Sequence, residues 1–119
     1  MGLTTANVRN VAITGHNGTG KTALMEQLLF YCNAISHPET IESGKTVSDF
    51  TEEEIADKIS IHSSLASVQW KSTSITFIDT PGTADFIGET IGALRAAEAV
   101  VMVVDALDGA QVETIKLWR

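Results

Sequence analysis

The stretch at residues 15–22 reads Gly15-His16-Asn17-Gly18-Thr19-Gly20-Lys21-Thr22. It matches the pattern G-x-x-x-x-G-K-[ST]. A β-branched apolar run from Val8 to Thr14 precedes it and predicts a strand. After Lys21 the apolar residues recur at helical spacing, which predicts a helix. A glycine-rich segment between a strand and a helix turns its backbone N–H groups towards phosphate oxygens, so we predict a phosphate-binding loop here.

Each part of this loop has a predicted contact. Its glycines let the backbone turn tightly, so that successive N–H groups point inward at phosphate. The Lys21 ammonium reaches the outer phosphates, and the Thr22 hydroxyl coordinates a Mg²⁺ that bridges them. The alternative is a glycine-rich turn without a ligand, which the flanking strand and helix disfavour. The predicted cofactor-binding residues of the loop are Gly15, His16, Asn17, Gly18, Thr19, Gly20, Lys21 and Thr22.

A second motif, Asp79-Thr80-Pro81-Gly82, ends an apolar run at Ile78. The Asp79 carboxylate is suited to hold a water molecule of the Mg²⁺ shell. Gly82 lets a backbone N–H approach a terminal phosphate, because no Cβ intervenes. In isolation the same residues are typical of a turn that ends a strand. Downstream of a phosphate loop we favour the metal and phosphate roles, and a GTPase-like site over a nucleotide kinase.

The remaining chain alternates strands and helices. The predicted elements are hairpin strands at 65–70 and 75–78 with a polar turn at 71–74, a helix at 86–94, a strand at 99–104 and a helix from 112. The continuous apolar run at 99–104 is typical of a strand covered on both faces, and we interpret Trp118 as a packing residue. This order predicts an α/β fold with a mostly parallel sheet flanked by helices, as in P-loop NTPases. Ligands of such sheets bind at the carboxyl ends of the strands.

Composition excludes several classes of protein. The 119 residues carry 8 basic and 15 acidic side chains, a net charge of −7, so the surface is a poor match for nucleic acid or anionic lipid. The single cysteine excludes an internal disulfide and favours a reducing compartment. The longest apolar run, residues 99–104, is far shorter than the ~20 residues of a membrane-spanning helix. We therefore expect a cytoplasmic protein with no membrane partner.

Several motifs together resemble the translational GTPases, and elongation factor G and its paralogues in particular. The resemblance rests on the phosphate loop, the helix running into Leu28-Leu29-Phe30-Tyr31, Asp79-Thr80-Pro81-Gly82 followed by Ala84-Asp85-Phe86, and Val103-Val104-Asp105-Ala106-x-x-Gly109-x-Gln111. It covers nearly the whole chain. It implies that residues 1–119 are the N-terminal portion of a GTP-binding domain, with switch I at about 44–62 and switch II at about 79–92.

The resemblance also implies roles for individual residues. Lys21 and Thr22 would hold phosphate and Mg²⁺, Asp79 would bind the metal through water, and Gly82 would contact the γ-phosphate. Ser60 stands where a threonine hydroxyl of the family completes the Mg²⁺ shell; the alternative is a solvated loop serine. The implied cofactors are GTP or GDP with Mg²⁺, and the implied partner is the ribosome.

Three departures from the family pattern are informative. Thr83 follows Gly82 where the family has a histidine that orients the attacking water, so the catalytic position would be carried by Gly82 and Thr83. A threonine is shorter and cannot become cationic, which predicts slow hydrolysis. Gly18 replaces an aspartate, which points to a divergent paralogue. The Asn-Lys-x-Asp motif of guanine recognition is absent from the chain, so a preference for GTP over ATP rests on the resemblance.

The function implied is that of a GTP-hydrolysing core of an elongation factor G-like protein, acting on the ribosome in a translocation-type step. One alternative is a nucleotide-dependent ribosome-binding module with weak or no hydrolysis; another is a non-translational P-loop ATPase or kinase. We expect the chain to be a fragment that lacks the strands which cover residues 99–104 in the family. That strand would then be an exposed edge through which the chain self-associates, and the activity of the fragment itself is in question.

Overall fold

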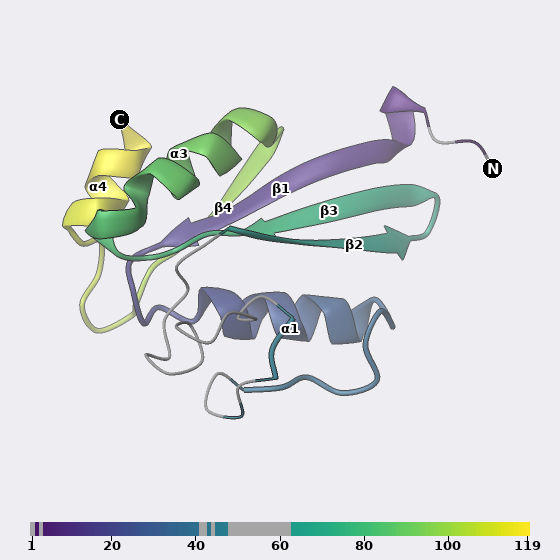
Figure 1. Ribbon diagram of the computed structural model, residues 1–119, viewed down its shortest axis with the longest axis horizontal. Coiled ribbons are helices and arrows are strands. Elements are labelled where there is room, and N and C mark those ends of the chain that lie inside the picture. The colour runs from purple at the N-terminus through teal and green to yellow at the C-terminus, as the bar shows by residue number, and fades with distance from the viewer. Residues whose placement is uncertain (1, 3, 41–42, 44, 48–62) are drawn as a thin grey trace.

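The computed structural model describes residues 2, 4–40, 43, 45–47 and 63–119, and these form a four-stranded sheet with helices on both faces (Figure 1). The strands and helices are β1 (Val8–Gly15), α1 (Lys21–Tyr31), β2 (Ser64–Trp70), β3 (Thr73–Asp79), α3 (Ile87–Ala96), β4 (Ala99–Val103) and α4 (Val112–Trp118). Short 3₁₀ turns at Thr5–Asn7 and Ala84–Phe86 precede β1 and α3. The predicted α/β architecture is confirmed.

The order of strands in the sheet is β2-β3-β1-β4. β1 pairs in parallel with β3 on one side and with β4 on the other, and β2 pairs antiparallel with β3. The register aligns Ile13 with Asp79 and Gly15 with Val103. The carboxyl ends of the three parallel strands therefore meet at one edge of the sheet, where the chain leaves β1 for α1.

The hydrophobic core has two layers because successive strand residues point to opposite faces. α1 lies on one face of the sheet, and α3 and α4 lie on the other (Figure 1). Ile13 and Phe77 pack with Met25 and Leu29 of α1, while their neighbours Ala12 and Ile78 pack against α3. The sheet is thus held from both sides, and the loop at 15–22 connects β1 to α1 across its edge.

The prediction that residues 99–104 are covered on both faces is wrong. Val100 and Val101 point to opposite faces and remain 46% and 41% exposed. The reason is topological: β4 pairs only with β1 among the described strands and is the last strand of the sheet. The interpretation of Trp118 as a packing residue is also wrong, since this side chain is 80% exposed. The turn predicted at 71–74 is shorter, because Thr73 and Ser74 already belong to β3.

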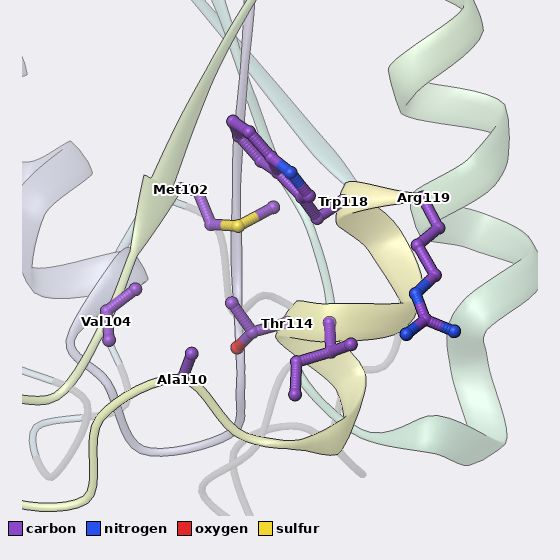
Figure 2. A pocket seen from close by; sticks show the side chains of 7 residues that line it. Met102, Val104, Ala110, Thr114, Trp118 and Arg119 are labelled. Atoms are coloured by element: carbon purple, nitrogen blue, oxygen red, sulfur yellow. The ribbon is translucent and has the colours of Figure 1, made fainter.

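An apolar hollow lies between β4 and α4 (Figure 2). Its volume is about 300 Å³. The side chains that line it are Met102, Val104, Ala110, Thr114, Ile115, Trp118 and Arg119. Figure 2 shows Trp118 and Met102 at one end of the hollow and Val104 and Ala110 at the other. Together with Val100 and Val101, this hollow leaves the β4 side of the sheet apolar.

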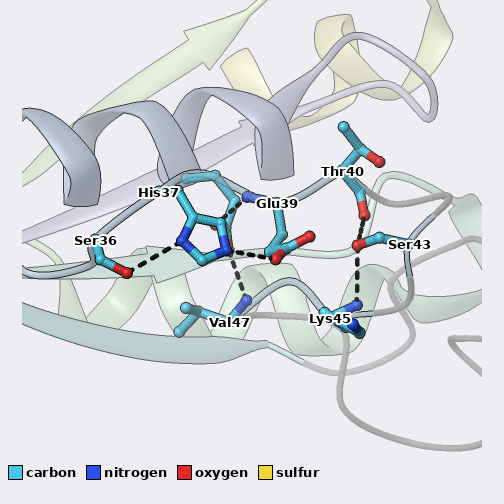
Figure 3. Close-up of polar contacts among 8 residues, drawn as sticks. Ser36, His37, Glu39, Thr40, Ser43, Lys45 and Val47 are labelled. Carbon is cyan, nitrogen blue, oxygen red and sulfur yellow. Dashed lines mark hydrogen bonds and ion pairs between the residues drawn. The ribbon is translucent and has the colours of Figure 1, made fainter.

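A buried carboxylate on α1 holds the segment that follows this helix. Glu26 is 2% exposed; its Oε2 accepts a hydrogen bond from the Glu39 backbone N–H at 3.1 Å, and its Oε1 accepts one from Val47 at 2.6 Å. The same segment has its own side-chain contacts, in which His37 lies between Ser36 and Glu39 (Figure 3). The pKa of Glu39 is lowered by hydrogen bonds from Ser43, the largest contribution, and from His37. Because each oxygen of Glu26 accepts a backbone N–H, the burial of this side chain is compensated.

Replacing Glu26 tests this anchoring. Glu26→Ala should lower the free energy of unfolding by about 2–3 kcal/mol, because two hydrogen bonds to a carboxylate are lost from a buried position. Glu26→Gln, which keeps one acceptor oxygen, should lose less. Gln27→Ala is the matched control, since Gln27 is the next residue of α1 and is exposed. Urea denaturation measures the difference, and equal losses in Glu26→Ala and Gln27→Ala would contradict the proposed role.

Candidate functional site

The loop at 15–22 is held by hydrogen bonds from its side chains to its own backbone. Gly20 is the N-cap of α1 and has a φ of 94°, a left-handed conformation that residues with a Cβ rarely adopt. The carbonyl oxygen of His16 accepts hydrogen bonds from the Thr19 hydroxyl at 2.8 Å and from the Lys21 ammonium at 2.9 Å. Lys21 is only 6% exposed. The cation is therefore held at the centre of the loop, next to the N-terminus of α1.

Thr22 and Asp79 meet beneath this loop. The Thr22 hydroxyl donates a hydrogen bond to Asp79 Oδ2 at 2.8 Å, across 57 residues of sequence. The two residues are 4% and 1% exposed. They come together because β1 and β3 are parallel neighbours whose last residues lie at the same edge. The sequence predicts Thr22 at the end of the loop and Asp79 at the end of a strand. The register of the sheet brings the two residues into contact.

The donors at this point suit a magnesium ion bound with phosphate. A hydroxyl and a carboxylate are hard oxygen ligands, which Mg²⁺ prefers, and Mg²⁺ takes few protein ligands because it keeps waters and phosphate oxygens. Among the described residues no group of three or more His, Cys, Asp or Glu side chains could hold a metal without such help. Thr22 and Asp79 therefore fit a Mg²⁺ shared with a polyphosphate.

The second motif lies directly on the loop. A Cβ on Gly82 would come within 2.6 Å of the Asn17 backbone nitrogen and 2.7 Å of its Cα, and would clash with the Lys21 ammonium. Only glycine fits this approach. The backbone of residue 82 is thus placed next to the Lys21 ammonium.

Two threonines that the sequence analysis did not single out hold this motif in place. Thr80 is fully buried, and both its hydroxyl and its backbone N–H donate to the Ile13 carbonyl, at 2.8 and 3.2 Å. The Thr90 hydroxyl donates from α3 to the Pro81 carbonyl at 3.1 Å. Thr80 lies between Asp79 and Gly82, which the sequence predicts to be functional. Its β-branched side chain at the end of a strand was the feature of the sequence that could have indicated its role. Nothing in the local sequence marks Thr90.

Thr83 follows the motif as the N-cap of the 3₁₀ turn Ala84–Phe86. Its hydroxyl oxygen is buried and has no hydrogen-bond partner within the part of the chain that the structure describes. Its backbone carbonyl accepts from Phe86 N at 3.2 Å. The side chain that takes the place of the family's histidine is therefore a small hydroxyl beside Gly82.

His16 contacts α4, far along the sequence. Its Nδ1 lies 2.7 Å from Glu113 Oε2, across 97 residues. The pKa of Glu113 is lowered by the hydrogen bond from its own backbone N–H and, next in size, by the contact with His16. Glu113 was not predicted to be part of the site, and no local pattern points to it.

Two further residues from the motifs of the resemblance are Asp105 and Ser60. Asp105, after β4, accepts hydrogen bonds from the backbone N–H groups of Asp108 and Leu107, which lower its pKa. This is the geometry of a turn-forming residue. Ser60 lies outside the described residues, as does most of the segment at about 44–62 assigned to switch I. Its metal-binding role stays a prediction.

Comparison with known proteins identifies related sequences over nearly the whole chain. The family model of the elongation factor Tu GTP binding domain matches residues 6–119. An elongation factor G-like protein of Mycobacterium tuberculosis is 40% identical over 112 residues, which are 94% of this chain and 16% of that protein. The mitochondrial ribosome-releasing factor 2 of Saccharomyces cerevisiae is 37% identical over 115 residues, 96% of this chain and 14% of the relative.

Solved structures give the same picture. A crystal structure of a protein from Thermus thermophilus superposes with a TM-score of 0.91 at 37% identity, covering 95% of this chain and 17% of that one. A bacterial selenocysteine-specific elongation factor superposes with a TM-score of 0.71 at 26% identity, covering 93% and 17%. The chain thus spans less than a fifth of the length of these relatives. None of the helices in the described ranges has the length and apolar character needed to cross a membrane.

A pair of threonine-to-valine substitutions tests the buried contact. Thr22→Val removes the donor from the buried Asp79 carboxylate and should lower the free energy of unfolding by about 1–3 kcal/mol. Thr14→Val is the matched control: Thr14 is fully buried, and its hydroxyl has no hydrogen-bond partner among the residues that the structure describes. Thr14→Val should be neutral or stabilising. Thermal or urea unfolding measures both variants, and equal effects would contradict the importance of the Thr22–Asp79 contact.

Proposed function

Because the chain belongs to the family of the elongation factor Tu GTP-binding domain, we propose that it binds GTP or GDP with Mg²⁺ and is the GTP-hydrolysing core of an elongation factor G-like protein. The ribosome is the proposed partner, and a translocation-type movement is the proposed step. The observation that carries the proposal is the buried Thr22–Asp79 pair next to the Lys21 ammonium, at the carboxyl edge of the parallel strands. The similarity to an elongation factor G-like protein and to ribosome-releasing factor 2 supports the ribosomal role.

The phosphate groups would be bound by the loop itself. The backbone N–H groups of residues 15–20 and the N-terminus of α1 surround the anion, and Lys21 neutralises part of its charge. Thr22 would ligate Mg²⁺ directly, Ser60 would complete the shell from switch I, and Asp79 would hold a metal-bound water. When bound, Mg²⁺ supplies the charge that stabilises the transferring phosphoryl group. We place the phosphate loop at 15–22, switch I at about 44–62 and switch II at about 79–92.

The catalytic end of the site would be formed by Gly82 and Thr83. Gly82 lies against Lys21, which supports the proposal that its backbone N–H contacts a γ-phosphate. Thr83 offers a short hydroxyl in place of an imidazole, which provides less positioning of water and no positive charge. This favours a second candidate function, a module whose binding to the ribosome depends on the nucleotide and whose turnover is slow. A cytoplasmic location is part of the proposal and is supported by the single cysteine.

Calorimetry with Mg²⁺ and GTP or GDP tests the central claim. We expect binding that requires Mg²⁺ and that falls by about a hundredfold or more in Lys21→Ala, because a desolvated charge-assisted contact with phosphate is lost. Lys71→Ala is the matched control, since Lys71 is exposed in the β2–β3 turn at the opposite end of the sheet. If the chain shows no magnesium-dependent affinity for guanine nucleotide, or if Lys21→Ala binds as well as the wild type, the proposal is wrong.

Single-turnover hydrolysis of GTP on ribosomes separates the two candidate functions. With the whole protein that carries this domain, Thr83→His should hydrolyse GTP at least about tenfold faster, because a general acid–base imidazole typically contributes ~10²–10⁴ in rate. Thr83→Asn is the control, because asparagine is polar and longer than threonine but has no titratable group. An unchanged rate in Thr83→His would mean that water is positioned by other residues.

We also propose that the chain self-associates through the edge strand at 99–104. β4 is the last of the described strands in the sheet and exposes Val100 and Val101, and edge strands pair with further strands. Val101→Lys should shift sedimentation towards monomer at high concentration, because a lysine on an edge opposes strand addition. Leu107→Lys is the control, since Leu107 is 96% exposed in the turn after β4. A wild-type chain that stays monomeric at high concentration would contradict this proposal.

A further inference from the structure

We infer that Glu113 is a positioning residue for the phosphate loop, acting through His16, and this inference rests on the proposed binding of nucleotide. Glu113 lies on α4, and the loop joins β1 to α1. A contact between side chains joins them, from Glu113 Oε2 to His16 Nδ1 at 2.7 Å. Neither the family pattern nor the local sequence indicated this contact.

Both the side chain and the backbone carbonyl of His16 are held by contacts. Its ring is fixed by Glu113, while its backbone carbonyl accepts hydrogen bonds from the Lys21 ammonium at 2.9 Å and from the Thr19 hydroxyl at 2.8 Å. The cation that would bind phosphate is therefore oriented by the peptide group of the residue that Glu113 anchors. Movement of the imidazole away from α4 would turn that carbonyl and change the position of the ammonium.

The charge of Glu113 determines which of the two residues donates the hydrogen bond. An ionised carboxylate only accepts hydrogen bonds, so His16 donates from Nδ1. The lowered pKa of Glu113 keeps it ionised at neutral pH. The side chains are 29% and 18% exposed, so the contact is partly shielded from water. Lys116, on the next turn of α4, is a further charged group close to Glu113.

The expected consequence concerns preorganisation. A loop whose backbone is already held in its binding conformation loses less conformational entropy when a phosphate binds. Without Glu113 the imidazole is free to leave α4, and part of the binding free energy is used to order the loop. The role is thus felt in nucleotide affinity more than in the stability of the fold, because α4 keeps its other contacts with the sheet.

The test is calorimetry of Mg²⁺–GDP binding to the whole protein that carries this domain. Glu113→Ala and His16→Ala should each weaken binding about five- to tenfold, and the double variant should be no weaker than the weaker single variant, because both changes break the same contact. Glu113→Gln, which retains an acceptor oxygen for Nδ1, should recover affinity to within about threefold of the wild type. Glu98→Ala is the matched control: Glu98 also accepts a hydrogen bond, from the Asn10 backbone N–H at 3.0 Å, but it directly precedes β4, towards the opposite end of β1 from the loop.

Each outcome is decisive. Wild-type affinity in Glu113→Ala, or losses that multiply in the double variant, would overturn the positioning role while leaving nucleotide binding intact. The same loss in Glu113→Gln as in Glu113→Ala would also overturn it, since the hydrogen bond would then not be the cause. Absence of Mg²⁺–GDP binding in the wild-type protein would instead overturn the proposed function, and this inference with it.

Discussion

The parallel pairing of β1 with β3 is the constraint on which the site depends. This pairing aligns Ile13 with Asp79 and brings the ends of two strands to one edge. Thr80 reinforces the alignment, because its hydroxyl and its backbone N–H both donate to the Ile13 carbonyl. Asp79 is then within hydrogen-bond reach of Thr22, which compensates for burying a carboxylate. A shift of this register would leave that charge buried away from its donor, at a cost of several kcal/mol.

Carboxylates anchor the chain on both sides of the phosphate loop. Glu26 on α1 holds the backbone at residues 39 and 47, and Glu113 on α4 holds His16. Each acidic group is paired with N–H donors inside the molecule. In a chain with a net charge of −7, attraction of an anionic ligand cannot come from the overall field. It has to come from local groups: backbone N–H dipoles, the Lys21 ammonium and a divalent cation.

β4 borders the candidate site and also carries exposed apolar side chains. Its last residue, Val103, is the register partner of Gly15, so the loop begins against this strand. The same strand is the edge of the sheet, with Val100 and Val101 exposed on its two faces. The apolar hollow beside α4 extends this surface. The strand that pairs with Gly15, at the start of the loop at 15–22, is therefore also an edge of the described sheet.

Local sequence was sufficient for features that depend on neighbouring residues. The loop at 15–22 is a motif of eight contiguous residues, and the apolar runs and helical spacing around it predicted β1, α1 and β3. The local sequence could not predict pairings between residues that are far apart in the chain. The contacts of Thr22 with Asp79 and of His16 with Glu113 span 57 and 97 residues and exist only once the sheet has its register and α4 its place. Burial followed the same rule: an apolar run predicts a strand, but whether its faces are covered depends on the elements beside it, and β4 has a neighbouring strand on one side alone among the described strands.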